Sequence, residues 1–238
     1  MNQTLKLGEL DIEVIQKDIR NIHLSVYPPA GRVRVSAPKH MSPSAIRVFT
    51  LSKLDWIKKQ QRKIRAQDRE TRRLYVNRES HYVWGRRYLL QVIEHHHAPA
   101  VRIKGSFLEL LIRPDTDEGQ RRDIVEAWYR DLVRAELPAL LSKWEPVMGV
   151  TVSKYHVRRM KTLWGSCTPG KRSIRINTDL AKKPIECLEY IVVHEMAHLL
   201  EASHNARFIH LMDTFMPTWR LRRKQLNQLP LRHEDWRY

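Results

Sequence analysis

The chain has 238 residues, 42% of them hydrophobic, which is enough to bury a core in one large domain or two small ones. A formal net charge of +17, from 43 Lys and Arg against 26 Asp and Glu, is expected to attract polyanions or acidic substrates at long range. Two cysteines exclude a disulfide framework, and no apolar run approaches the ~20 residues of a membrane-spanning helix. With no signal peptide recognised either, a cytoplasmic protein that does not enter membranes is expected.

The first half of the chain has the patterns of short strands around one helix. Residues 12–38 are predicted to form two strands, because apolar residues alternate on both sides of a turn rich in proline and glycine. Ser42 and Pro43 are predicted to begin a helix, since serine caps helix N-termini and proline fits the first helical position. Residues 82–93 and a hairpin around residues 104–106 are predicted to add further strands.

The second half is predicted to be mainly helical. Residues 117–145 carry apolar side chains near helical spacing, which predicts one long helix. Residues 151–157 and 173–177 are predicted to be strands. Pro184 is assigned to the first position of a helix whose apolar face lies within residues 185–193.

The eleven residues HEMAHLLEASH, from position 194 to position 204, predict a metal site. Positions i and i+4 of a helix share one face, so His194 and His198 can direct two imidazoles at one ion. Glu195 lies beside them, close enough to reach a water on that ion as a general base. A turn of the chain would bring His204 back as a third ligand. Three protein ligands leave a fourth position for water, which is typical of catalytic zinc.

The spacing H-E-x-x-H-x5-H also occurs in metzincins, but a true metzincin is disfavoured. Metzincins carry a glycine, which permits a sharp turn, where this chain has Glu201. Here Ala202 and Ser203 would form the turn, and Ser203 would cap a second helix. Met212 and Met216 are better explained as packing residues of that helix than as a Met-turn.

These elements predict an α+β fold, in which an N-terminal β-rich region packs on a zincin-like catalytic core with an HExxH helix and a small sheet. Residues 1–115 would form the β-rich region, with one long basic helix. Residues 116–238 would form the metal-binding catalytic region. Both are expected to belong to one integrated unit.

Several segments between about Ile15 and about Leu226 combine into one pattern. They are Gly31–Pro38, Asp55–Ile57, Leu163–Cys167, Ser173–Asn177 and Val192–Leu199, with His204 and Phe208. In this combination the chain resembles the YgjP-like metallopeptidase family, a gluzincin-like group related at its core to SprT-like and WLM proteases. The metal motif alone is shared by many families, whereas its combination with the Trp-Gly-Ser-Cys and Ala-Pro segments is far more specific.

The resemblance implies a site for zinc, and this chain has the expected residue at each position. The implied ligands are His194, His198 and His204, with Glu195 as the catalytic carboxylate. The resemblance also implies that the strand at residues 173–177 borders the active cleft as an edge strand.

The rest of the site is less defined by the sequence. The predicted substrate-binding residues are Trp164, Gly165, Ser166 and Arg175. The transition-state donor stays unassigned, and Tyr155, His156 and Arg158 are weak candidates that precede the Trp-Gly-Ser-Cys segment.

The predicted function is a zinc-dependent metallohydrolase, with a metallopeptidase acting on a peptide or protein through zinc-activated water as the first interpretation. One alternative is a metal-dependent nucleoside triphosphate pyrophosphatase, because the same water can attack phosphorus while basic residues bind the phosphates. Another is a nucleic-acid-associated, SprT-like protease. The metal motif specifies activation of water and leaves the scissile bond open.

A basic segment between Lys58 and Arg73 has two interpretations. It is either a solvated helix face or a surface that binds nucleic acid without sequence preference, or another anion. The candidate residues for such binding are Arg62, Arg65, Arg69 and Arg72.

Overall fold

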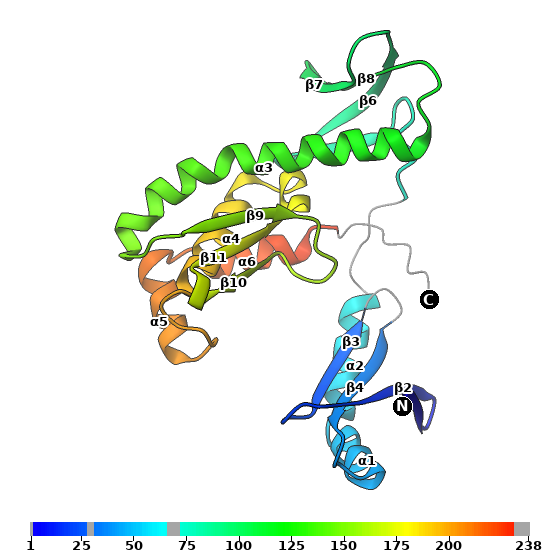
Figure 1. Cartoon of the computed structure of the whole chain (residues 1–238), viewed down its shortest axis with the longest axis vertical. Helices are drawn as coiled ribbons and strands as arrows, with labels where there is room; N and C mark the ends of the chain where they lie inside the picture. The colour runs from blue at the N-terminus through cyan, green and yellow to red at the C-terminus, as the bar shows by residue number, and fades with distance from the viewer. Residues whose placement is uncertain (1, 28–30, 66–71, 231–238) are drawn as a thin grey trace. The chain divides into compact units, whose positions relative to one another are not determined.

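The structure is a computed structural model that describes residues 2–27, 31–65 and 72–230. The described residues form two compact units, one up to residue 65 and one from residue 72 (Figure 1). The α+β class is confirmed, with sheets in the N-terminal part, one long helix and further helices towards the C-terminus. The predicted boundary between residues 115 and 116 falls inside the second unit, between a strand and a helix that contact each other.

The first unit is a four-stranded sheet with two helices packed on it. Its strand order is β1-β2-β4-β3, in which β2 and β4 are parallel and the other neighbours are antiparallel. The bounds are β1 Asn2–Leu7, β2 Leu10–Lys17, β3 His23–Tyr27, β4 Arg32–Pro38, α1 Pro43–Ser52 and α2 Leu54–Arg65.

The helical part of this unit begins as predicted but is divided. Ser42 Oγ accepts a hydrogen bond from Ala45 N–H at 3.3 Å, and Pro43 is the first helical residue. The single long basic helix that the sequence predicts is instead two helices. Lys53 N–H bonds to Thr50 O at 3.1 Å, a three-residue step that ends α1 before α2 starts.

The second unit contains two sheets and a long helix. One sheet has the order β5-β6-β8-β7 and the other β10-β11-β9, and the pairs β6/β8 and β9/β11 are parallel. The strands are β5 Ser80–Val83, β6 Arg86–Glu94, β7 Ala100–Lys104, β8 Phe107–Ile112, β9 Lys154–Arg158, β10 Gly165–Thr168 and β11 Ser173–Asn177. The helices are α3 Glu118–Met148, α4 Ile185–Ala197, α5 Ala206–Phe215 and α6 Trp219–Gln228, with short 3-10 helices η1 Pro169–Lys171 and η2 Thr178–Lys182.

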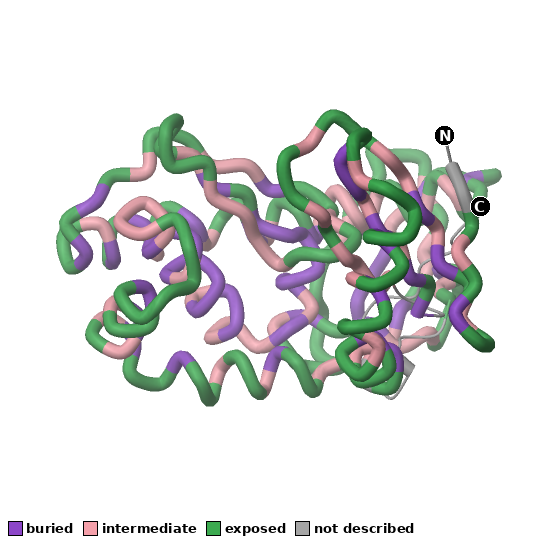
Figure 2. The backbone as a smooth tube through the Cα atoms, turned by 90° about the horizontal axis from the view of Figure 1, so that it is seen from below, coloured by how far each residue is buried: buried purple, intermediate pink, exposed green. Residues whose placement is uncertain are grey.

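Helix α3 supports both sheets and α4, the helix that carries the H-E-x-x-H motif. It starts with a capping box in which Asp117 Oδ1 accepts from Gln120 N–H at 2.8 Å, and it contacts β7, β8, β9, α4 and η2. Buried positions recur along it at helical spacing (Figure 2). They are Val125, Tyr129, Val133, Leu137, Leu141, Trp144 and Met148. On the α4 side, Trp144 Nε1 donates to Glu189 Oε1 at 2.9 Å.

Most strand predictions for this unit are confirmed, with one omission. The predicted strand at residues 82–93 is β5 and β6 joined by a tight turn, and the hairpin about residues 104–106 joins β7 to β8. Strand β11 has the predicted bounds, 173–177, and the strand predicted at 151–157 begins later, at Lys154. Strand β10 was not predicted.

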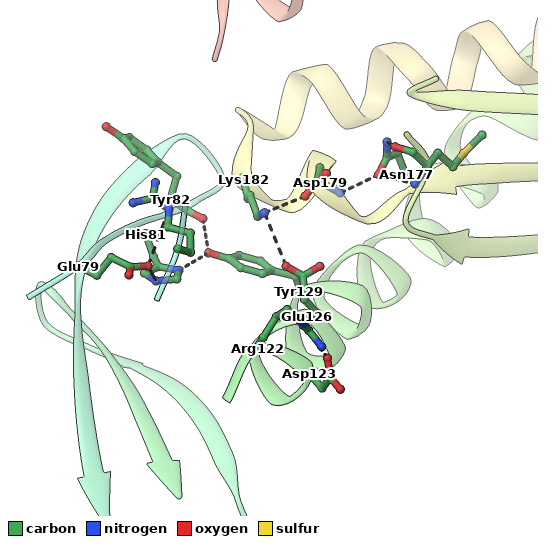
Figure 3. A network of polar contacts seen from close by, with 12 residues as sticks. Glu79, His81, Tyr82, Arg122, Asp123, Glu126, Tyr129, Asn177, Asp179 and Lys182 are labelled. Atoms are coloured by element: carbon green, nitrogen blue, oxygen red, sulfur yellow. Dashed lines mark hydrogen bonds and ion pairs between the residues drawn. The ribbon is translucent and has the colours of Figure 1, made fainter. Parts of the chain in front are cut away.

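A polar network links β5, α3 and η2, the short helix that leads into α4 (Figure 3). Tyr129 Oη donates to Tyr82 O at 3.0 Å, and its ring centroid lies 5.1 Å from Lys182 Nζ. Lys182 Nζ donates to Asp179 Oδ1 at 2.8 Å and lies 3.9 Å from Glu126 Oε1. The network therefore fixes the approach to the metal-binding helix.

Asn177, at the end of β11, extends this network to the segment before β10. Its Oδ1 accepts from Asp179 N–H at 3.1 Å, and its Nδ2 donates to Met160 O at 2.9 Å and to Leu163 O at 2.8 Å. Its own N–H donates to Trp164 O at 2.9 Å. One buried amide thus holds the chain just before it enters the functional site.

Candidate functional site

Three histidines converge where α4 ends. His194 lies in the last turn of α4, His198 is its C-cap residue, and their ring centroids are 5.0 Å apart. His204 lies in the following loop, with its Nε2 3.0 Å from His194 Nε2. One nitrogen of each ring lies within 4.8 Å of the others. The ring of Phe208 stacks on His198 with centroids 4.6 Å apart, so the imidazoles are packed as well as clustered.

Side-chain hydrogen bonds, rather than a glycine, shape the turn that returns His204. Glu201 Oε1 accepts from Ser203 N–H at 3.2 Å and from Ser203 Oγ at 3.0 Å. Asn205 caps α5, because its Oδ1 accepts from Phe208 N–H at 3.0 Å. The prediction that Ser203 caps this helix is wrong, since the hydroxyl is engaged by Glu201 and the helix starts later.

The geometry of the three rings fits a metal ion. His198 Nδ1 lies 3.0 Å from Glu201 O, so a proton on Nδ1 leaves Nε2 as a ligand. Two nitrogens at about 2.0–2.1 Å from a tetrahedral zinc lie about 3.3 Å apart, close to the separation of His194 and His204. His194 Nδ1 is buried without a hydrogen-bond partner among the described residues. Three imidazoles are a donor set suited to zinc and to other first-row metals.

The charge state of the rings is also the one that binds metal. Burial, followed by the repulsion of His198 and His204, lowers the pKa of His194 to about 3. Burial and the charge of His198 likewise lower the pKa of His204. Both rings are therefore neutral near pH 7 and have lone pairs to donate.

Glu195 is a buried carboxyl group pressed against strand β10. It is only 5% exposed, and burial raises its pKa to about 8. A Cβ added at Gly165 would lie 2.5 Å from Glu195 Oε1, so only glycine leaves room for this carboxyl. A divalent cation at the histidines would favour the ionised carboxylate, which is the form that accepts a proton.

A cleft of about 560 Å³ opens beside these groups, between α4, α5, α6 and residues 162–165. Trp164 and Gly165, two of the predicted substrate-binding residues, line it. Ser166 and Arg175 are not among its lining residues; they pair across β10 and β11, and Arg175 is exposed. Substrate binding by any of the four stays a prediction.

Strand β10, and not β11, is the edge of the small sheet on the side of the cleft. The order β10-β11-β9 makes β11 the central strand, so the expectation that residues 173–177 form an edge strand is wrong. The short segment Gly-Ser-Cys-Thr lacks the alternation of apolar residues that would have predicted a strand.

Sequence analysis missed several residues of the cleft, among them Tyr190, Trp219 and Arg223. Tyr190 lies one turn before His194 on α4, with ring centroids 5.9 Å apart, so helical spacing could have identified it. Trp219 and Arg223 come from α6, and only the packing of α6 on α4 brings them here.

The weak candidates for a transition-state donor lie elsewhere. Tyr155, His156 and Arg158 belong to β9 and do not line the metal cleft. They border a separate cavity of about 400 Å³, together with Arg130 and Arg134 of α3. The described structure therefore does not place any of the three beside the histidine cluster.

Of the four arginines predicted to bind anions, two have described side chains, and these belong to different units. Arg62 is exposed on α2, in the first unit. Arg72 is exposed in the second unit, with its Nη2 3.2 Å from Glu118 Oε1. Arg69 and the side chain of Arg65 lie outside the described residues. Nucleic-acid binding stays a prediction, and no described helix is long and apolar enough to cross a membrane.

Comparison with known proteins adds a family to this geometry. A family model described as YgjP-like, metallopeptidase domain, matches residues 20–229. The solved metallopeptidase zymogen abylysin of Pyrococcus abyssi is 18% identical with a TM-score of 0.36, and the match covers 40% of this chain and 97% of abylysin. The metallopeptidase zymogen jannalysin of Methanocaldococcus jannaschii is also 18% identical, with a TM-score of 0.32 and coverages of 37% and 94%. No curated protein matches the sequence.

Proposed function

The chain belongs to the YgjP-like metallopeptidase family, and on this premise we propose that it is a zinc-dependent peptidase that hydrolyses peptide bonds in protein substrates. One observation carries the proposal: three clustered imidazoles and a buried carboxyl group lie together beside one cleft. His194, His198 and His204 would hold the ion. When bound, zinc supplies a Lewis acid and an acidified water.

Glu195 would carry the proton. Its carboxylate takes a proton from the attacking water and then delivers it to the nitrogen of the leaving amine as the C–N bond breaks. Burial against β10 keeps competing bulk water away from this carboxyl group and holds it in one place. Such positioned proton transfer contributes about 10²- to 10⁴-fold to a rate.

Strand β10 would align the substrate as an added strand. Asn177 N–H bonds to Trp164 O, so alternation along an antiparallel pair gives Ser166 and Thr168 the next bonds to β11. The N–H and C=O groups of Gly165 and Cys167 then point away from β11. An extended peptide can pair with them next to Glu195, which is recognition by β-augmentation.

The test is metal analysis combined with a side-by-side activity screen. Purified protein should contain about one zinc per chain and should hydrolyse an unfolded protein. His204→Ala should weaken zinc binding at least about 100-fold, a larger loss than changes around a ligand cause. His210→Ala, which changes an exposed histidine of α5 outside the cluster, is the matched control and should keep the metal.

Nucleoside triphosphates form the second arm of the screen. The same activated water can attack phosphorus, so release of pyrophosphate without cleavage of any protein or peptide would replace the peptidase proposal with a pyrophosphatase. Full zinc retention by His204→Ala under mild chelation would show instead that the third ligand lies elsewhere.

A further inference from the structure

A single arginine lines the metal cleft from the side of α6. Arg223 is exposed, and its guanidinium carbon lies 6.0 Å from the ring centroid of Trp219 in the cleft wall. Among the described residues that line the cleft, Arg223 is the only one with a Lys or Arg side chain, and Glu195 is the only one with an Asp or Glu side chain. The cleft therefore offers one permanent positive charge close to the reacting groups.

Arg223 has no acidic partner among the described residues. Asp213, which contacts the start of α6, is already engaged: it accepts from Trp219 Nε1 at 2.7 Å and pairs with both terminal nitrogens of Arg220. Glu195 is not a partner either, because burial is the only cause that acts on its raised pKa. The exposed guanidinium of Arg223 is therefore not neutralised by an ion pair within the described residues.

The positive charge of Arg223 lies in the same cleft as the metal site. His194, His204 and Glu195 line this cleft together with Arg223. The same charge opposes the burial that raises the pKa of Tyr190. A group bound to this guanidinium would therefore be held within electrostatic reach of the ligands.

We propose that Arg223 binds an anionic group of the substrate, a carboxylate or a phosphate, next to the bond that is hydrolysed. This specificity role rests on the proposed hydrolytic function. A guanidinium presents paired donors that match the two oxygens of a carboxylate or phosphate. The apolar side chains of Phe208, Ile209 and Leu226 lower the local dielectric and strengthen such a pair.

Two sources can supply this anion, and matched substrates distinguish them. A carboxylate comes from an acidic side chain or a free peptide C-terminus, and a phosphate comes from a nucleotide. The experiment uses peptides that differ only as Glu against Gln, or as free against amidated C-terminus, and a nucleoside triphosphate as the third arm. Hydrogen bonds to charged groups predict a preference of about 10- to 100-fold in kcat/KM for the anionic member.

Three variants of the full chain test whether Arg223 is the source of the preference for anionic substrates. Arg223→Gln should lower kcat/KM for the anionic peptide about 10- to 100-fold more than for the neutral peptide, and Arg223→Lys should restore part of the difference. Arg220→Gln is the matched control, because Arg220 lies one turn earlier on the same tryptophan but is paired with Asp213 and does not line the cleft. It should keep the full preference.

Binding provides a readout that is independent of hydrolysis. Zinc-loaded Glu195→Gln protein, with and without Arg223→Gln, can be titrated with the same ligands while tryptophan fluorescence is followed, since Trp164 and Trp219 line the cleft. If wild-type protein cleaves no peptide, the peptidase proposal fails while this titration still tests Arg223. Equal losses for anionic and neutral ligands, an equal effect of Arg220→Gln, or no binding of any anionic ligand would each overturn the inference.

Discussion

The second unit contains two buried polar clusters that differ in how their charged groups are paired. In the network around α3, Lys182 lies between the acids Asp179 and Glu126 (Figure 3). In the same network, Glu79 accepts hydrogen bonds from the N–H groups of Leu74 and Tyr75. At the metal site, burial acts on Glu195 without an opposing ion pair or hydrogen bond that would hold its pKa down.

The pKa shifts of two glutamates express this difference. Burial alone would raise the pKa of Glu79, but hydrogen bonds from His81 and from Leu74 N–H hold it below its usual value. At Glu195 burial acts without such partners and raises the pKa to about 8. A buried carboxyl group without a cation or hydrogen-bond donor costs stability, and a strongly raised pKa of this kind is typical of groups that take part in chemistry.

The largest effect is expected for Glu195→Gln, which changes the buried carboxyl group of the metal site and leaves the network around α3 intact. The amide keeps the shape of the side chain but cannot accept and return a proton, so hydrolysis should fall by about 10²- to 10⁴-fold. Zinc content should stay at the wild-type level, and the metal-free variant should be no less stable than the wild type, because a costly buried acid is gone. Turnover and metal stoichiometry are measured on the same preparation. Near wild-type turnover would remove Glu195 from the mechanism.

The converse change is Lys182→Met in the network. It leaves Asp179 and Glu126 buried without their cation, which should cost about 3 kcal/mol of unfolding free energy. Zinc stoichiometry should be unchanged. Lys143→Met is the control, since Lys143 also pairs with a carboxylate but its side chain is 59% exposed, and surface pairs contribute about 0–1 kcal/mol. Thermal or urea unfolding measures both, and equal losses would mean that burial does not govern the network.

The sequence predicted the parts of the site that depend on local spacing. His194, Glu195 and His198 follow from helix periodicity, and a short loop limits where His204 can lie. Arg223 could not be assigned to the site, because α6 reaches it only through tertiary packing. The same limit applies to β10. Its residue Gly165 approaches Glu195 closely in the folded chain, but its sequence lacks the alternation that predicts a strand.

Gly165→Ala is expected to lower both the stability of the protein and its turnover. The added methyl would lie 2.5 Å from Glu195 Oε1 and 2.8 Å from its Cγ, so the carboxyl or β10 must move. Overpacking of this kind costs about 1–3 kcal/mol, and turnover should fall more than zinc affinity does. Gly170→Ala is the matched control, because an added Cβ there meets nothing within 4 Å. Unchanged turnover in Gly165→Ala would show that the fit against β10 does not position Glu195.

The smallest effect is expected for Glu79→Gln, and it is a loss of unfolding free energy that depends on pH. Because its pKa is lowered in the folded state, Glu79 contributes stability above its unfolded value of 4.5, and this contribution is lost as pH falls through the folded value. Glu79→Gln should therefore be less stable than wild type by about 1–2 kcal/mol at pH 7, with the difference shrinking towards pH 3. Urea midpoints of the metal-free proteins at several pH values measure this. Glu118→Gln, in an exposed pair with Arg72, is the control and should change stability by less than about 1 kcal/mol. A difference at Glu79 that is the same at pH 7 and pH 3 would mean that packing, rather than the ionised carboxylate, is what the network needs there.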